Sequence, residues 1–233
     1  MSNITIAVPT VISDIVYHSV TERQLIANIA TGEMAFPVCG KNGILLWGDF
    51  GTGKTTLARL LPDAIEQGKC GSNAYYDFIR CGQGLTGPTL MAQITKRSTL
   101  ISANASGYHY FVLDEVDNLT KAAQASLKSA MGIRDTIFIM TTNHLSKIDV
   151  GVQNRSVRVN CNAAVHYDYL PVAKQMLDAC GGKSVEDHKL LPIIQRCNGS
   201  VREIAEQMQR LAAIQKARAK SAAVAQQTTA VMQ

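Results

Sequence analysis

The residues with the clearest chemical meaning form one glycine-rich segment. Residues 48–55 read Gly-Asp-Phe-Gly-Thr-Gly-Lys-Thr, which has the G-x-x-x-x-G-K-T spacing of a phosphate-binding loop. An apolar run at 44–47 predicts a buried strand before it, and residues 55–61 have helical periodicity. Glycines in such a loop let several N–H groups face one anion, and the helix dipole adds to the attraction. We therefore expect a nucleotide's phosphates to be bound by Gly48, Asp49, Phe50, Gly51, Thr52, Gly53, Lys54, Thr55 and Thr56.

Three polar side chains at the end of this segment have expected partners on the nucleotide or its metal ion. Lys54 is expected to reach the terminal phosphates, and the Thr55 hydroxyl to ligate Mg²⁺. Thr56 is expected to add a contact to the inner phosphates. The apolar positions of the following helix run to Leu61, and Pro62 and Gly68 are expected to interrupt the chain after it.

A pair of acids supplies the second half of the predicted chemistry. The run 108–113 predicts a strand that leads directly into Asp114 and Glu115. Ligands of α/β sheets bind at the carboxyl ends of the strands, where this pair is expected to lie. Asp114 is expected to hold Mg²⁺, and Glu115 to polarise the attacking water as general base. Without the phosphate loop upstream, two acids at a strand end would be interpreted as solvated turn residues.

Three further residues are candidates for the nucleotide site. Asn143 follows the predicted strand 135–142, where its amide could orient the water or touch the terminal phosphate, although an Asn after a strand is often only a turn former. Val16 and Tyr17 precede the first helix, expected at 22–29 with a cap at Ser19 or Thr21. They are expected either to contact an adenine ring or to belong to the core.

The elements around these residues alternate between strand and helix, which is typical of an α/β fold. Strands are expected at 44–47, 75–81, 108–113, 135–142 and 157–160, and helices at 89–100 and 119–131. In the second of these helices Lys121, Gln124 and Lys128 are expected on the exposed side. Beyond residue 162 the pattern is helical, at 165–179, 185–196 and 201–219. We expect a nucleotide-binding domain at 1–162, a small helical domain at 163–220 and a disordered tail at 221–233.

Composition narrows the class of protein. The chain has 233 residues, 46% of them hydrophobic, a mean hydropathy of +0.02 and a net charge of +5. No apolar run approaches the ~20 residues needed to span a bilayer, and the N-terminus lacks a secretory pattern. Six scattered cysteines without a C-x-x-C pair favour reduced thiols and disfavour zinc. We therefore expect a cytoplasmic protein without membrane contact. The charge permits a nucleic-acid partner without requiring one.

Taken in order, these pieces resemble the AAA+ ATPases, and among them most closely the small ATPase subunits of replication factor C type clamp loaders. The resemblance spans residues 9–215 and includes 114–120 with Gln124, Thr142-Asn143, the segment 153–156 and the segment 199–202. It implies a P-loop domain with a parallel five-stranded sheet followed by a small all-helical lid. It further implies ATP and Mg²⁺ as ligands and a ring or spiral of five to seven identical subunits.

The resemblance also implies roles for particular side chains. Asn143 looks like sensor 1, Arg155 like the arginine finger offered to a neighbouring subunit's ATP, and Arg202 like the lid residue that reaches the γ-phosphate. A fixed planar charge supplied in trans would make hydrolysis depend on assembly. Arg158 is the rival finger, although its strand position favours solvent or a structural pair.

Two departures from the family pattern limit what the resemblance carries over. Clamp loaders have a helical collar domain, and the chain ends before one, so we expect assembly through the ATPase and lid domains. The segment 82–95 has no Lys or Arg, although clamp loaders use arginines there on the DNA backbone. Contacts to DNA would have to come from the remaining basic residues, namely Lys96, Arg97, Lys121, Lys128 and Arg134.

We therefore expect an ATPase that acts on DNA in replication or a related transaction, in the manner of a clamp loader or helicase loader, with a possible replication-protein partner. One alternative is a protein-remodelling ATPase, which the absence of an aromatic residue at 82–87 disfavours. Another is a nucleotide-dependent scaffold with little turnover. The basic stretch after Glu206 is compatible both with a solvated helix end and with a nucleic-acid contact.

Overall fold

A computed structural model of the chain describes residues 9–82 and 84–231, the last nine of these as backbone only. The first eight residues of the predicted nucleotide-binding domain and the last two of the predicted tail lie outside the described residues. The chain divides into two compact units, one of residues Pro9–Ala163 and one of helices that begins at Ala164. The first unit contains all the strands that the structure describes.

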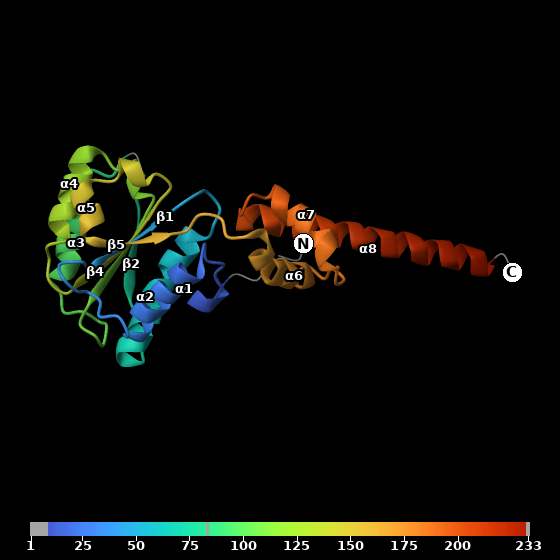
Figure 1. The fold of residues 1–233 in the computed structure, drawn as a ribbon, viewed down its shortest axis with the longest axis horizontal. Helices are drawn as coiled ribbons and strands as arrows, with labels where there is room; N and C mark the ends of the chain where they lie inside the picture. The colour runs from blue at the N-terminus through green and yellow to red at the C-terminus, as the bar shows by residue number, and fades with distance from the viewer. Residues whose placement is uncertain (1–8, 83, 232–233) are drawn as a thin grey trace. The chain divides into compact units, whose positions relative to one another are not determined.

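The first unit is built on one parallel sheet of five strands, shown in Figure 1. Its order β2-β3-β4-β1-β5 places β1, which leads into the glycine-rich loop, between β4 and β5. The predicted parallel five-stranded sheet is thereby confirmed. The strands are β1 (Gly43–Trp47), β2 (Tyr76–Arg80), β3 (His109–Asp114), β4 (Thr136–Thr142) and β5 (Ser156–Asn160).

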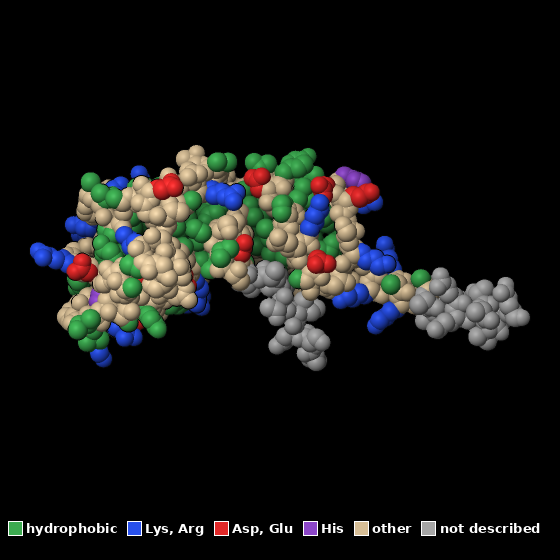
Figure 2. All heavy atoms as spheres, turned by 90° about the horizontal axis from the view of Figure 1, so that it is seen from below, with side chains coloured by type: hydrophobic (Ala, Val, Ile, Leu, Met, Phe, Trp, Pro, Cys, Tyr) green, Lys and Arg blue, Asp and Glu red, His purple; other side chains and the backbone are tan. Residues whose placement is uncertain are grey.

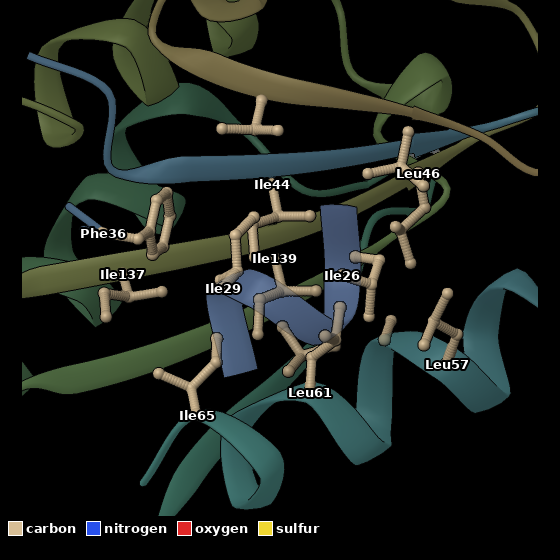
Figure 3. Packing of buried hydrophobic residues seen from close by; sticks show 14 of the residues in the cluster. Ile26, Ile29, Phe36, Ile44, Leu46, Leu57, Leu61, Ile65, Ile137 and Ile139 are labelled. Atoms are coloured by element: carbon tan, nitrogen blue, oxygen red, sulfur yellow. The ribbon is translucent and has the colours of Figure 1, made fainter. Parts of the chain in front are cut away.

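Helices cover both faces of this sheet (Figure 1). One face carries α1 (Val20–Thr31) and α2 (Lys54–Cys70), and the other carries α3 (Gly87–Ser98), α4 (Lys121–Ala130) and α5 (Val150–Asn154). Because side chains alternate along a strand, neighbouring residues of β1 enter opposite cores. Figure 3 shows the first core, in which residues of α1 and α2 meet β1 and β4: Ile26, Ile29, Leu57, Leu61, Ile65, Ile44, Leu46, Ile137 and Ile139.

Helix α2 runs through both residues that were expected to interrupt it. Pro62 lies inside the helix, where it removes one backbone hydrogen bond at a cost of about 3 kcal/mol. Three fully buried apolar side chains, Leu57, Leu61 and Ile65, offset this cost, since each contributes about 1.5–3 kcal/mol. Gly68 is required by packing, because a Cβ there would lie 1.7 Å from the Ala30 carbonyl oxygen of α1.

The second unit contains α6 (Leu170–Ala179), α7 (Asp187–Arg196) and α8 (Val201–Val231), preceded by a 3₁₀ turn, His166–Tyr169. The expectation of disorder from residue 221 is wrong as far as Val231, since α8 continues to that residue. Its sequence has no Gly or Pro and is rich in Ala and Gln, which favour helix even without tertiary contacts. Among the helices described, none combines the length and apolarity that crossing a membrane requires.

Candidate functional site at the carboxyl edge of the sheet

The glycine-rich loop connects β1 to α2 and adopts a conformation that depends on its glycines. Gly51 and Gly53 have φ angles of 80° and 95°, and Gly48 has φ 150°. A Cβ on Gly48 would lie 2.6 Å from the Asn162 backbone nitrogen, so the chain passes too close for a side chain. In the described structure no side chain caps α2 at Gly53, which leaves its first N–H groups available to an anion.

Lys54 lies within this loop rather than in solvent. Its side chain is only 7% exposed, and its Nζ donates to the carbonyl oxygens of Gly48 at 2.9 Å and Asp49 at 2.5 Å. Burial lowers the pKa of Lys54, while the nearby Cys161 and carboxylates such as Asp49 oppose that shift. The loop carbonyls therefore hold the ammonium within the glycine-rich loop, and its contact with phosphates stays a prediction.

Asp114 and Thr55, the two predicted metal ligands, are in direct contact. Asp114 Oδ1 accepts from Thr55 Oγ1 at 2.8 Å and from Thr141 Oγ1 at 2.7 Å. No hydrogen bond from a described residue reaches its Oδ2. The described part of the chain has no group of three or more His, Cys, Asp or Glu placed to bind a metal unaided. One carboxylate and one hydroxyl fit Mg²⁺, which usually keeps water and is shared with substrate phosphates.

Glu115 leaves the end of β3 in a left-handed conformation, with φ 59° and ψ 52°. Its Oε2 lies 3.8 Å from Nη2 of Arg80 and 3.3 Å from Nδ2 of Asn118. Arg80 ends β2, the edge strand beyond β3, so this carboxylate lies toward that edge and away from β1. Arg80 was not among the predicted site residues, although its place at the end of the strand before the acidic pair was a usable signal.

Asn143 is brought to the same edge of the sheet as the phosphate loop. It follows β4, the neighbour of β1, and the Gly48 N–H donates to the Thr142 carbonyl at 3.3 Å. The Asn143 N–H donates to Asp117 Oδ1 at 3.4 Å, and Thr142 Oγ1 donates to the same oxygen at 2.9 Å. Asp117, to which no role was assigned, therefore ties the Asn143 segment to the acidic turn after β3.

The two residues proposed to contact adenine are half-buried. The Tyr17 hydroxyl donates to the Ile12 carbonyl at 2.9 Å, and its ring packs against the core of α1 and α2. This packing favours the core alternative for Tyr17, and a contact of Val16 or Tyr17 with adenine stays a prediction. The loop itself exposes an aromatic ring, since Phe50 is 68% exposed and lies edge-on to His144 with 6.2 Å between centroids.

The predicted finger, Arg155, lies at the opposite end of the sheet from its own phosphate loop. Its carbonyl accepts from the Gly43 N–H at 3.0 Å, at the start of β1, whereas the loop follows the end of β1. Five strand residues separate the two ends, which corresponds to about 16 Å. Its guanidinium is half-buried and donates from Nη1 to the Gly151 carbonyl at 3.2 Å. The rival Arg158 is exposed on β5, and Arg202 lies in the first turn of α8 in the helical unit.

The five candidate DNA contacts lie on α3, on α4 and in the turn before β4. Lys121 and Lys128 occupy the first and last turns of α4, about 10 Å apart along the helix axis at 1.5 Å per residue. Arg97 pairs with Asp77 at 3.1 Å, and Lys128 lies 4.0 Å from Asp149. The remaining two candidates lie at the last turn of α3 and in the exposed turn before β4, namely Lys96 and Arg134.

The prediction for Gln124 on α4 has a definite outcome. Gln124 was expected on the exposed face of α4, but it is 4% exposed and the expectation is wrong. Its amide donates to the Leu119 and Lys147 carbonyls and accepts from the Asp149 N–H, so it ties α4 to the turn before α5.

In Figure 2, Lys and Arg side chains gather around the described part of α8. The members of this stretch are Arg210, Lys216, Arg218 and Lys220.

Comparison with known proteins assigns this arrangement to a family. The family model described as "ATPase family associated with various cellular activities (AAA)" matches residues 44–161, from β1 to the end of β5. The chain belongs to the AAA ATPases. The glycine-rich loop, the acidic pair, Asn143 and Arg155 therefore lie within the matched ATPase domain, and the predicted resemblance to AAA+ ATPases is confirmed.

Curated relatives of this AAA chain are replication factor C small subunits. Small subunit 2 of Pyrobaculum islandicum is 25% identical over 175 residues, which cover 74% of the chain and 54% of the relative. The small subunit of Thermoplasma acidophilum is 26% identical over 167 residues, or 69% and 50% of the two chains. The AAA chain thus spans about half the length of the curated relatives it matches.

Solved structures with the same fold are less similar in sequence. The Thermotoga maritima RuvB Holliday junction branch migration motor superposes with a TM-score of 0.64 at 16% identity, covering 87% of the chain and 64% of that protein. PCH-2 of C. elegans gives 0.54 at 17% identity, with 80% and 61% covered. At these identities the likeness establishes the fold alone.

Proposed function

We propose that the chain binds Mg-ATP between adjacent copies of itself in a ring or spiral and uses hydrolysis to switch that assembly on DNA. The observation that carries this proposal is the position of Arg155. The residues expected to act on the phosphates lie at the carboxyl edge of the sheet, whereas Arg155 lies at the amino end of β1. A separation of about 16 Å leaves a second copy as the route by which Arg155 reaches a phosphate.

The proposed division of labour follows the contacts in one copy. Lys54 and the loop N–H groups bind the triphosphate, and Asp114 with Thr55 holds Mg²⁺. When bound, the ion neutralises charge on the phosphate oxygens. Glu115 accepts the proton of the attacking water once its carboxylate leaves Arg80, and Asn143 orients that water. Arg155 of the adjacent copy and Arg202 of the lid supply further positive charge at the γ-phosphate.

DNA is the polymer we propose for this assembly. The curated relatives are replication factor C small subunits, and one structural neighbour is a Holliday junction motor. The chain has a net charge of +5, and exposed basic residues follow Glu206 on α8. Because phosphate contacts release counterions, binding through these residues should weaken as salt rises.

Phosphate release in the presence of different polymers tests the proposal. Hydrolysis should be stimulated by single-stranded, duplex or forked DNA, and the stimulation should fall as salt rises. Lys54→Ala, which removes the phosphate-binding ammonium, is the control for contaminating ATPases. Size-exclusion chromatography with a slowly hydrolysed ATP analogue should show a larger assembly than without nucleotide.

Other outcomes would redirect the proposal. Stimulation by an unfolded polypeptide and not by any DNA would identify a protein-remodelling ATPase. Assembly without hydrolysis under all conditions would identify a nucleotide-dependent scaffold. A chain that remains monomeric with bound nucleotide would contradict the shared site.

A further inference from the structure

Thr141, a residue of β4 without a predicted role, lies between the two acids of the site. It is 2% exposed. Its Oγ1 donates to Asp114 Oδ1 at 2.7 Å and accepts from the Glu115 N–H at 2.9 Å. A threonine hydroxyl has one hydrogen and two lone pairs, so a single group can make both bonds. Thr141 is therefore bonded to the carboxylate expected to hold the metal and to the backbone of the expected general base.

Both partners have a conformation that needs support. The Thr55 and Thr141 hydroxyls meet on one oxygen of Asp114, which fixes the carboxylate and leaves its other oxygen without a described partner. Glu115 is left-handed, with φ 59°, a conformation that costs a non-glycine residue roughly 1–2 kcal/mol. Such a conformation persists where surrounding bonds hold it, and the Thr141 hydroxyl accepts the N–H of that residue.

A buried threonine of this strand does not need such partners to satisfy its hydroxyl. Thr136, at the other end of β4 and 1% exposed, donates its Oγ1 to a main-chain carbonyl, that of Ile133, at 2.7 Å. The Thr136 hydroxyl also accepts from Asn42 Nδ2 at 3.4 Å. The two threonines therefore differ in what they bond: the Thr141 hydroxyl joins two acidic residues of the site, whereas neither partner of the Thr136 hydroxyl is acidic.

We propose that Thr141 is a positioning residue for ATP hydrolysis, with one hydroxyl that holds the Asp114 carboxylate for the metal and the Glu115 turn for proton transfer. The inference rests on the roles proposed above for Asp114 and Glu115. Thr141 acts through these two residues. Removing its hydroxyl should lower kcat and weaken metal binding while leaving the affinity for the nucleotide itself little changed.

Three variants of the full chain test this. Thr141→Val keeps the shape of the side chain and removes both hydrogen bonds, whereas Thr141→Ser keeps the hydroxyl. Thr136→Val is the matched control, because it removes a buried hydroxyl bond from the same strand at the end away from the site. The measurements are kcat and KM for ATP, Mn²⁺ binding to the ADP-bound protein by electron paramagnetic resonance, amide exchange at Glu115 and the melting temperature.

Thr141→Val should lower kcat and Mn²⁺ affinity by about 10- to 100-fold, the range seen when groups that orient metal ligands are lost. Exchange of the Glu115 amide should accelerate, ADP affinity without metal should stay near wild type, and Thr141→Ser should restore most of the loss. Thr136→Val should lower the melting temperature without these effects. If Thr141→Val does not fold, Thr141→Ala is measured with the same expectations.

Equal kcat and Mn²⁺ affinity in Thr141→Val and Thr136→Val would overturn the inference and leave Thr141 a structural residue. Variants Asp114→Asn and Glu115→Gln separate this failure from failure of the proposed function. If both lose hydrolysis while Thr141→Val does not, only the inference about Thr141 fails. If both retain hydrolysis, the proposed roles of the two acids fail.

Discussion

Two buried carboxylates in the ATPase unit, Glu66 and Asp114, differ in how many of their oxygens accept hydrogen bonds from the described chain. Glu66 is 0% exposed and accepts from the Ser106 N–H at 2.8 Å, from Ser106 Oγ at 2.6 Å and from the Tyr110 hydroxyl at 2.8 Å. Asp114 is 6% exposed and accepts two hydroxyl bonds, both on Oδ1. Both oxygens of Glu66 are bonded to the chain, whereas Asp114 keeps one oxygen for a ligand.

This difference favours a structural role for Glu66 and is compatible with the metal-binding role proposed for Asp114. Burial alone would raise the pKa of Glu66, but the hydrogen bonds from Ser106 and Tyr110 outweigh it and lower that pKa. Its negative charge is therefore compensated within the fold. Asp114 is supported on one side only, which is the arrangement that a shared Mg²⁺ site requires. Changes at the two residues should thus affect different properties of the protein.

Asp114→Asn should have the largest effect of these variants. It should lower the rate of hydrolysis and leave the stability of the fold nearly unchanged. Losing the charge should lower kcat by roughly 100-fold or more, in the range measured when a group that stabilises transition-state charge is removed. The hydroxyl bonds to Oδ1 can remain, so the melting temperature should change by a few degrees at most. Phosphate release and calorimetry check this. A large fall in the melting temperature with normal turnover would reverse the comparison.

Glu66→Gln should do the opposite. An amide in place of the carboxylate turns one acceptor into a donor that faces the Ser106 and Tyr110 donors, which should cost about 1–3 kcal/mol of unfolding free energy. Hydrolysis per folded molecule should be unchanged. Urea denaturation and phosphate release are the measurements. Tyr110→Phe, which removes one of the donors, is the control and should cost less.

The stability difference between wild type and Glu66→Gln should depend on pH. The folded pKa of Glu66 lies below its ordinary value of 4.5, so ionised Glu66 contributes stability above that value and loses it as pH falls through the folded pKa. The difference in unfolding free energy between the two proteins should therefore have its largest value near pH 6 and become smaller below about pH 4.5. Denaturation at several pH values tests this, and a difference that grows on acidification would contradict it.

Arg80→Ala should have the smallest effect. The Arg80–Glu115 pair is long, at 3.8 Å, and the arginine is 74% exposed, so it should contribute only about 0.2–1 kcal/mol to stability. Because Arg80 holds Glu115 toward β2, its loss should raise hydrolysis without DNA by at most about 5-fold, the rate equivalent of that energy. Steady-state assays with and without DNA check the direction. A fall in basal hydrolysis would show that Arg80 supports the base.

The parts of the site that follow from local sequence were predictable. The glycines, Lys54 and Thr55 occupy one continuous segment, and strand periodicity placed Asp114 and Asn143 at strand ends. Because the strands are parallel, these ends meet at one edge of the sheet. The phosphate loop and the acids could therefore be placed together without knowing the strand order.

The parts that depend on packing between distant segments were not predictable. The Thr141 hydroxyl and the Arg80 side chain reach the acids only because β3 lies between β2 and β4. The burial of Gln124 depends on the turn before α5. Gly68 is needed inside α2 because the backbone of α1 lies too close for a side chain there. The length of α8 reflects helix propensity, which weighed less in the prediction than the composition of the tail.

The shared pocket is the central claim, and mixing two variants tests it directly. Glu115→Gln lacks the proposed base but keeps Arg155, and Arg155→Ala keeps the base but lacks the finger. Each alone should hydrolyse ATP slowly, whereas a mixture should recover activity wherever the Arg155→Ala pocket meets the arginine of a Glu115→Gln neighbour. Activity that only averages the two variants at every mixing ratio, with co-assembly confirmed, would contradict a pocket built by two copies.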